Sequence, residues 1–265
     1  MQRVARICLA LLLLLPGSAA PATRIVLAAT PLSRMDLHWW RERFEAKQAE
    51  LRSRKVDLIF LGDSITQDYE LSGPPEWHDF LPVWERYYGN RNAVNLGFKG
   101  DATSHLLWRI ENGETDGIKP KVAVVLIGAN NLGRLHWAPQ DTVAGVDTIM
   151  TQLRHRLPTT RLLLLGVLPS ERSEWASQAT AEINRSLAAR YGSSGEVTYL
   201  DIGSLFIKDG KLNRELFFDP KLTPPASPVH PTAEGQALMA AAIEPTLAAL
   251  LGDRPRIAEA ASARQ

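Results

Sequence analysis

The sequence predicts an α/β fold in which helices cover both faces of a mainly parallel sheet. Five short apolar runs, interpreted as strands, alternate with stretches whose apolar residues recur at helical spacing. Three of these runs end in Gly, Asp or Asn residues, where the crossover loops of a parallel sheet begin. No repeat or linker interrupts the alternation, so we expect one domain over residues 36–252.

Each expected element follows from a local pattern. The apolar runs end in turn residues and are typical of buried strands: 57–61, 93–96, 122–127, 162–167 and 197–200. Helical stripes separate them: 35–51, 77–88, 103–113, 141–157, 174–191 and 232–251. Thr103 or Ser104 is expected to cap the third helix, and Thr232 the last one. Residues 23–35 form an N-terminal segment in this interpretation, and 253–265 a flexible tail.

Composition and charge exclude several classes of protein. The chain has 265 residues, 45% hydrophobic and 22% charged, with 30 Lys and Arg against 29 Asp and Glu. This content of apolar residues is too high for a disordered chain. Near-neutral charge without a basic block is not typical of a protein that binds nucleic acid. We therefore expect a globular protein with no nucleic-acid partner.

The first 22 residues have the three-part pattern of a secretory signal peptide. Arg3 and Arg6 precede the apolar run 7–15, and residues 20–22 (Ala-Pro-Ala) fit a cleavage site. The run is too short for a stable membrane span, so we expect export to the periplasm or beyond; the alternative is an uncleaved anchor. Cleavage removes two basic residues and Cys8, the only cysteine, which leaves a formal charge of −1 and no thiol.

The first strand leads into the segment 62–66 (Gly-Asp-Ser-Ile-Thr). Glycine permits a sharp strand-to-helix turn, which places a serine hydroxyl at the sheet edge. The free N–H groups that open the next helix then suit a developing oxyanion. The alternative is a plain helix cap by Asp63 or Ser64.

Two further strand ends carry polar or glycine-rich turns. Segment 95–101 (Asn-Leu-Gly-Phe-Lys-Gly-Asp) has two glycines that allow a tight turn with accessible N–H groups, but it lacks the dinucleotide-binding spacing. Segment 128–131 (Gly-Ala-Asn-Asn) offers an amide that can donate to the same oxyanion. A general base is expected from His230, which precedes the final helix on a loop.

The segments at 62–66, 95–101, 128–131 and 230–235 (His-Pro-Thr-Ala-Glu-Gly), in this order, resemble the SGNH/GDSL hydrolase family. The sequence is most similar to the branch related to the platelet-activating-factor acetylhydrolase catalytic subunits. The resemblance covers about residues 36–250. It implies a flavodoxin-like, three-layer α/β/α fold with a five-stranded sheet, and ester hydrolysis without metal or cofactor.

The resemblance also implies roles for individual residues. Ser64 would be the nucleophile and donate its N–H to the oxyanion, and His230 would be the general base. Gly97 would supply a second N–H and Asn130 a side-chain donor. Asp63 and Trp137 are further candidates for contact with substrate.

The acidic residue that would complete a Ser-His-Asp triad departs from the family pattern. Family members carry Asp three residues before the His, but Ser227 stands there, and the nearest upstream carboxylate is Asp219. Three alternatives follow: Asp219 reaches the histidine across an enlarged loop, a backbone carbonyl orients the imidazole instead, or the site is impaired. These three alternatives make different predictions about the surroundings of His230.

We expect an exported serine esterase that removes short acyl groups, acetyl first, from carbohydrate or small molecules through an acyl-serine intermediate. Lysophospholipase or thioesterase activity is the alternative among enzymes. A non-catalytic carbohydrate-binding protein on a hydrolase scaffold is the alternative from another class, supported by the missing Asp at 227. The sequence makes no prediction of oligomeric state.

Overall fold

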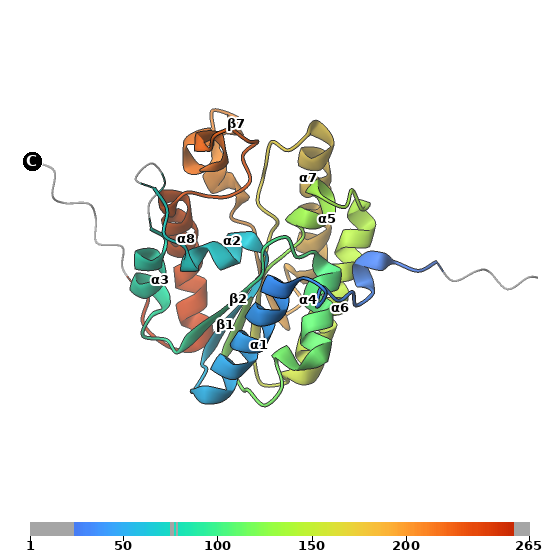
Figure 1. Ribbon diagram of the computed structural model, residues 1–265, viewed down its shortest axis with the longest axis vertical. Helices are drawn as coiled ribbons and strands as arrows, with labels where there is room; N and C mark the ends of the chain where they lie inside the picture. The colour runs from blue at the N-terminus through green and yellow to red at the C-terminus, as the bar shows by residue number, and fades with distance from the viewer. Residues whose placement is uncertain (1–23, 75–76, 78, 257–265) are drawn as a thin grey trace, which may run out of the picture.

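The computed structural model describes residues 24–74, 77 and 79–256, so the predicted signal peptide lies outside the described residues. Its centre is a five-stranded sheet with strand order β2-β1-β3-β4-β5, flanked by helices on both faces (Figure 1). Every neighbouring pair in this sheet is parallel. The predicted three-layer α/β/α fold is confirmed.

The five strands lie close to the ranges expected from the sequence. Their bounds are β1 (Leu58–Gly62), β2 (Ala93–Gly97), β3 (Val122–Leu126), β4 (Arg161–Leu165) and β5 (Val197–Leu200). Gly62 is in register with Gly97 on one side and with Leu126 on the other. The ends of β2, β1 and β3 therefore stand level, which brings their three loops to one edge of the sheet.

Helices cover the two faces unequally (Figure 1). One face packs against α3 (Leu81–Tyr88) and α8 (Ala233–Leu251). The other face is covered by α1 (His38–Ser53), α4 (Thr103–Arg109), α6 (Pro139–Arg156) and α7 (Glu174–Tyr191). Strand side chains alternate between the two hydrophobic cores, as the pleat requires, so each strand is buried on both sides.

Several elements differ from the prediction for local reasons. The helix expected from 77 begins at Leu81, and the Trp77 ring stacks on Phe218 instead. Ala102 precedes α4, and the Thr103 hydroxyl donates to Ala28 O rather than capping the helix. Three short elements carry too few residues to show a period: α2 (Ser64–Gln67), α5 (Ala129–Gly133) and the hairpin β6–β7 (Ile207–Lys208, Lys211–Leu212).

Both terminal segments are anchored where the structure describes them. Ala28 is buried and Leu32 N–H donates to Ser104 O. Asp253, the first residue of the predicted flexible tail, accepts two hydrogen bonds from Arg91. The tail is thus held at its start, and residues 257–265 lie outside the described part.

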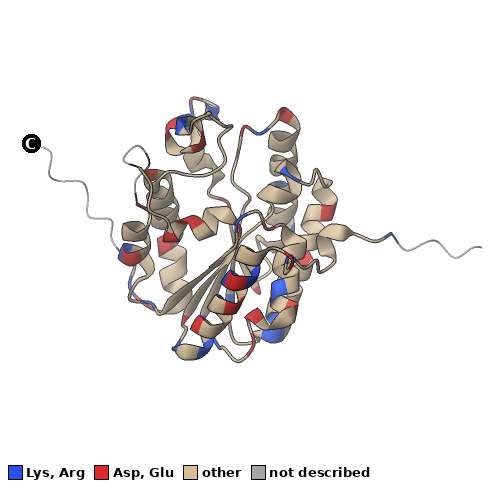
Figure 2. Cartoon of the chain, in the orientation of Figure 1, with Lys and Arg blue, Asp and Glu red and all other residues tan. Residues whose placement is uncertain are grey.

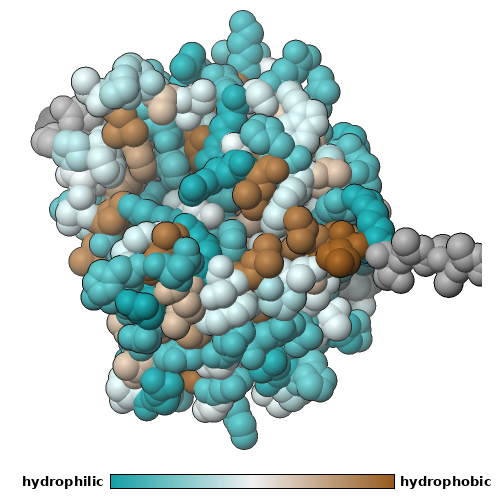
Figure 3. Space-filling view, turned by 45° about the vertical axis from the view of Figure 1, so that its right-hand side comes forward, coloured by the Kyte–Doolittle hydropathy of each residue, from teal (hydrophilic) through white to brown (hydrophobic). Residues whose placement is uncertain are grey.

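The surface is mixed in charge and hydropathy. Acidic and basic residues are interspersed along the helices (Figure 2). Hydrophobic groups are scattered among hydrophilic ones on the face turned forward in Figure 3. Among the described residues, none of the helices has the length and apolar character to cross a membrane.

Candidate active site

Ser64 opens the short helix α2 directly after β1, at the level sheet edge. Asp63 is the N-cap, and its carboxylate accepts a 3.0 Å hydrogen bond from Ile65 N–H. The capping role therefore goes to Asp63, which leaves the Ser64 hydroxyl free for another partner. Gly62 permits this turn, because a Cβ there would lie 2.6 Å from Leu126 O on the neighbouring strand.

A hydrogen-bonded chain runs from Ser64 through His230 to Asp219. Ser64 Oγ lies 2.9 Å from His230 Nε2, and His230 Nδ1 lies 2.6 Å from Asp219 Oδ1. A carboxylate only accepts, so Nδ1 carries the proton and Nε2 is free to accept from the serine hydroxyl. The structure thus brings together the serine, the histidine and Asp219, the upstream carboxylate considered for the acid.

Asp219 reaches His230 because the chain loops out and returns. Ala226 N–H donates to Asp219 O at 3.0 Å, which closes the loop, and residues 221–227 are exposed. Ser227 is among these exposed residues. Asp219 Oδ2 accepts from the N–H groups of Val229 at 2.8 Å and His230 at 2.6 Å. An Asp at position 227 would accept the same two hydrogen bonds, because Val229 and His230 are the second and third residues after that position.

The surroundings of the site raise the pKa of His230 and lower the pKa of Asp219. Burial lowers the pKa of His230, but the hydrogen bond and charge of Asp219, with Asp68 and Asp63 nearby, raise it above the ordinary value overall. Burial raises the pKa of Asp219, and the hydrogen bonds from His230 and Val229 outweigh this and lower it. The pair therefore favours an ionised aspartate that stabilises a protonated imidazole.

Aromatic rings support the imidazole from one side. The Phe218 ring stacks on His230 with centroids 5.3 Å apart and planes 16° apart, and Trp77 stacks on Phe218 at 4.4 Å. Phe218 is buried. Sequence inspection did not single it out, although it is the residue directly before Asp219. The stack restricts the ring plane of His230 while its two nitrogens face Ser64 and Asp219.

The expected oxyanion donors lie at the same edge of the sheet, but they differ in whether they already donate a hydrogen bond within the protein. The Ser64 N–H finds no acceptor among the described residues, as the start of a helix allows. Asn130 Nδ2 donates to Asp101 O at 3.0 Å and lies 3.3 Å from Asp63 Oδ2. Gly97 N–H donates to Asn95 Oδ1 at 2.9 Å, so it is not free to bind an oxyanion. In the described part of the chain, no acceptor is found for the Gly100 N–H on the same loop.

The two further candidates for substrate contact are placed differently from the expectation. Asp63 is buried, and its oxygens face Ile65 N–H and Asn130, so it orients the amide instead of lining an open surface. Burial raises the pKa of Asp63 to about 7. Trp137 follows α5 and is half-buried, and its backbone N–H donates to Asn131 O. Among the described residues, no contact is found between its ring and the Ser64–His230 pair. Its role stays a prediction.

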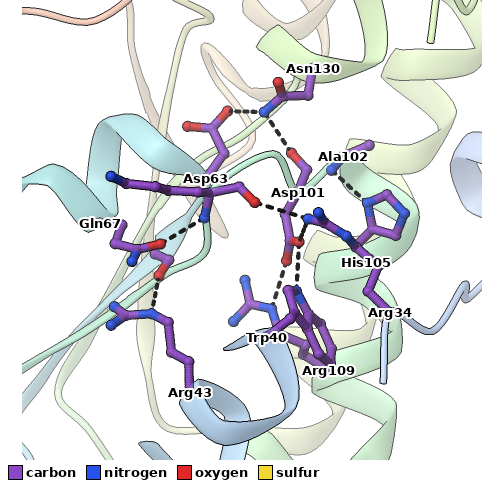
Figure 4. Close-up of polar contacts among 12 residues, drawn as sticks. Arg34, Trp40, Arg43, Asp63, Gln67, Asp101, Ala102, His105, Arg109 and Asn130 are labelled. Carbon is purple, nitrogen blue, oxygen red and sulfur yellow. Dashed lines mark hydrogen bonds and ion pairs between the residues drawn. The ribbon is translucent and has the colours of Figure 1, made fainter. Parts of the chain in front are cut away.

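A buried polar network fixes the loop after β2 (Figure 4). Asp101 accepts from Trp40 Nε1 at 2.8 Å, from Arg34 at 2.8 Å and from Arg109 Nε at 3.0 Å. Arg109 is fully buried and also donates to Gly62 O at 3.2 Å, which joins this loop to the serine turn. The network holds Asp101 O, the acceptor of the Asn130 amide, in place.

Buried Asp68 lies one helical turn after Ser64 and has one unpartnered carboxylate oxygen among the described residues. Burial raises its pKa to about 6.

No set of three or more His, Cys, Asp or Glu suited to a metal ion is found in the described ranges. The donors present are those of acyl transfer through serine.

Comparison with known proteins decides between acyl transfer and binding. The sequence profile of the GDSL-like lipase/acylhydrolase family matches residues 60–238, which contain Ser64, Asn130, Asp219 and His230. The chain belongs to this family. It is 30% identical over 185 residues to the platelet-activating factor acetylhydrolase IB subunit alpha2 of Rattus norvegicus, covering 68% of this chain and 74% of the relative. The human alpha1 subunit is 30% identical over 182 residues.

Solved structures of other hydrolases share its fold. A GDSL-like lipase from Bacteroides thetaiotaomicron superposes with a TM-score of 0.61 at 17% identity, over 78% of this chain and 96% of the other. A carbohydrate acetylesterase family member from Sinorhizobium meliloti superposes with a TM-score of 0.54 at 16% identity, over 75% of this chain and all of the other. At these identities the likeness concerns the fold. The expected family and enzyme class, a GDSL-type ester hydrolase, are confirmed.

Proposed function

We propose that this acylhydrolase is an exported serine esterase that removes short acyl groups, acetyl first, from carbohydrate or small-molecule esters. The observation that carries the proposal is the chain of hydrogen bonds from Ser64 through His230 to Asp219. Membership of the acylhydrolase family supports the reaction class. Export is proposed from the signal-like pattern of residues 1–22.

The geometry leads to a two-step mechanism. His230 Nε2 takes the hydroxyl proton as Ser64 Oγ attacks the ester carbonyl, and the Asp219 carboxylate stabilises the imidazolium. The tetrahedral intermediate then collapses, the C–O bond to the alcohol breaks, and His230 returns the proton to that oxygen. Water, activated by the same nitrogen, cleaves the acyl-serine ester to release the acid and regenerate Ser64.

The oxyanion is stabilised at the edge formed by the loops of β1, β2 and β3. We assign this role to the Ser64 N–H, the Asn130 amide and a backbone N–H of the loop 97–101. In that loop the Gly100 N–H is the better candidate, because the Gly97 N–H is bound to Asn95 while that of Gly100 has no acceptor among the described residues. Each such donor contributes a factor of about 10²–10³ to kcat in comparable sites.

The acetyl preference draws its support from the relatives. The relatives in rat and human are acetylhydrolase subunits by name, and one structure of the same fold is a carbohydrate acetylesterase family member. The non-catalytic alternative depended on the absence of Asp at 227. Its support disappears because Asp219 occupies the position of the acid beside His230.

Turnover of 4-nitrophenyl esters of increasing acyl length tests this proposal. We expect kcat/KM to be greatest for acetate and to fall as the chain lengthens. A maximum at about eight carbons or more, as for a lipid-like acyl chain, would favour the lysophospholipase alternative. No turnover of any ester by folded protein would contradict esterase activity itself.

A further inference from the structure

Two arginines lie against the short helix that carries Asn130. Arg172, on the loop after β4, donates from Nη1 to Ala129 O at 3.2 Å, and a Cβ on Gly133 would lie 2.0 Å from the same nitrogen. Arg134 follows α5 directly, and a Cβ on Gly100 would lie 2.3 Å from its Nη1. One guanidinium thus crosses α5 itself, and the other covers the loop whose Asp101 O receives the Asn130 amide.

Among the described residues, these two arginines differ from the other cations around the site in having no salt-bridge partner. Arg34 pairs with Asp101, Arg43 with Glu70 and Arg109 with Asp101. Within the part of the chain that the structure describes, no salt bridge is found for Arg134 or Arg172. The carboxylates whose fields reach Arg172 are Asp63 and Asp219, and both are engaged elsewhere, one with Ile65 N–H and the other with His230.

The energetic cost of this arrangement falls on Arg172, because Arg134 is exposed and keeps its hydration. Arg172 is half-buried, so it has lost part of its hydration, and the nearby positive charge of Arg134 adds repulsion. A planar, five-donor guanidinium is the side chain best suited to carboxylate or phosphate oxygens. An anion that contacts both groups would offset the desolvation and the repulsion together.

We propose that Arg134 and Arg172 bind an anionic group, a carboxylate or a phosphate, on the ester that Ser64 cleaves. This inference rests on the proposed function, because it assigns a substrate class to the same site. The anion would lie beside α5, on the side of the reacting carbonyl that faces Asn130. It would be part of the acyl group or of the alcohol, and these two positions are distinguished by experiment.

Two matched pairs of substrates test the proposal. The first compares the mono-4-nitrophenyl ester of succinate, whose acyl group ends in a carboxylate, with the neutral 4-nitrophenyl butyrate. The second compares 4-acetoxyphenyl phosphate with the methyl ether of 4-acetoxyphenol, which moves the charge to the alcohol. For each protein the measured quantity is the ratio of kcat/KM for the anionic ester to that for its neutral partner, at low salt.

We expect the wild type to prefer the anionic ester in one pair, and the ratio to fall about tenfold in Arg134→Gln and in Arg172→Gln, as for the loss of one charge-assisted contact. The ratio should also fall when about 0.5 M salt is added, because salt screens the attraction between the arginines and the anion. Arg52→Gln, an exposed arginine of α1, is the control and should leave the ratio unchanged.

The outcomes separate the two proposals. Turnover of the neutral esters with no anionic preference in either pair would overturn the anion site and leave the esterase proposal standing. The same holds if the preference exists but persists in both arginine variants. Failure of the wild type to hydrolyse any of the four esters would contradict the esterase proposal, and the anion site with it.

Discussion

At the scale of single residues, the proposed triad depends on Asp219, because no acidic residue stands three positions before His230. Its carboxylate makes three hydrogen bonds, two to backbone N–H groups and one to the imidazole. The backbone bonds fix the carboxylate, and the fixed carboxylate sets the tautomer of His230. Ser227 occupies the expected position in sequence but lies on the exposed loop.

The variant Asp219→Asn is expected to lose about 10⁴ in kcat, because an amide at this position favours the wrong histidine tautomer and leaves the imidazolium uncompensated. KM should change little, since Asp219 does not face the ester. Steady-state kinetics with 4-nitrophenyl acetate measures both values. Ser227→Ala is the matched control and should keep wild-type turnover. Near-wild-type turnover in Asp219→Asn would refute the role of Asp219.

The pH dependence follows from the direction of the His230 shift. The base must be neutral to accept a proton, and its pKa lies above the ordinary 6.5, so kcat/KM should rise with pH through an apparent pKa above 6.5. Asp219→Asn removes the group that raises this pKa, so the acid limb of the residual activity should move to lower pH. A profile that is unchanged in the variant would show that another group controls the limb.

At the scale of elements, the loop 220–227 separates Asp219 from Pro228-Val229-His230 in the sequence. Asp219 precedes Pro220, and Pro228 precedes Val229, so removal of residues 220–227 would join Asp219 to Pro228-Val229-His230. The resulting spacing is that of the family. Ala226 N–H already meets Asp219 O, so the two ends of the loop lie close together.

Excision of residues 220–227 is therefore expected to preserve the triad and turnover of 4-nitrophenyl acetate within about tenfold, a loss of about 1.4 kcal/mol or less in transition-state stabilisation. Exposed loops tolerate deletion when their ends meet without strain. The measurement is kcat/KM for the excised and full-length proteins. Complete loss of activity in a folded deletion variant would show that the loop holds Asp219 in place.

Element boundaries show which parts of the site were predictable from sequence. Strands and long helices have many apolar residues at one period, so their positions were predicted to within a few residues. The helix α5 has five residues and the loop contact between Asp219 and His230 spans eleven positions, so neither leaves a periodic signal. The sequence predicted three site residues that lie next to a long apolar strand or helix: Ser64 after β1, Asn130 after β3 and His230 before α8. Phe218, Arg134 and Arg172 depend on tertiary contacts alone.

At the scale of the whole molecule, one buried network joins the N-terminal segment, the first helix and the ends of β1 and β2. Arg109 donates to Leu96 O and Gly62 O, pairs with Asp101 and Glu114, and lies 4.0 Å above the centre of the Phe98 ring. Burial raises the pKa of Glu114, against the lowering effect of Arg109. The acidic partners are buried, so they depend on this arginine.

Arg109→Met is expected to lower the free energy of unfolding by about 3–5 kcal/mol, because it leaves buried Glu114 without its partner and removes one of the two arginines that pair with Asp101. Urea unfolding followed by tryptophan fluorescence measures the change. Arg52→Gln, on the exposed face of α1, should change it by less than about 0.5 kcal/mol. Equal stability of the two variants would mean that the network is not a determinant of the fold.

The central claim is that Ser64 is a nucleophile activated by His230 and Asp219. Reaction of the folded protein with a fluorophosphonate, followed by mass spectrometry of its peptides, tests it most directly. We predict a single adduct on Ser64, absent from Ser64→Ala and strongly slowed in His230→Ala. Absence of the adduct in folded wild type, or an adduct on another residue that survives Ser64→Ala, would contradict the claim.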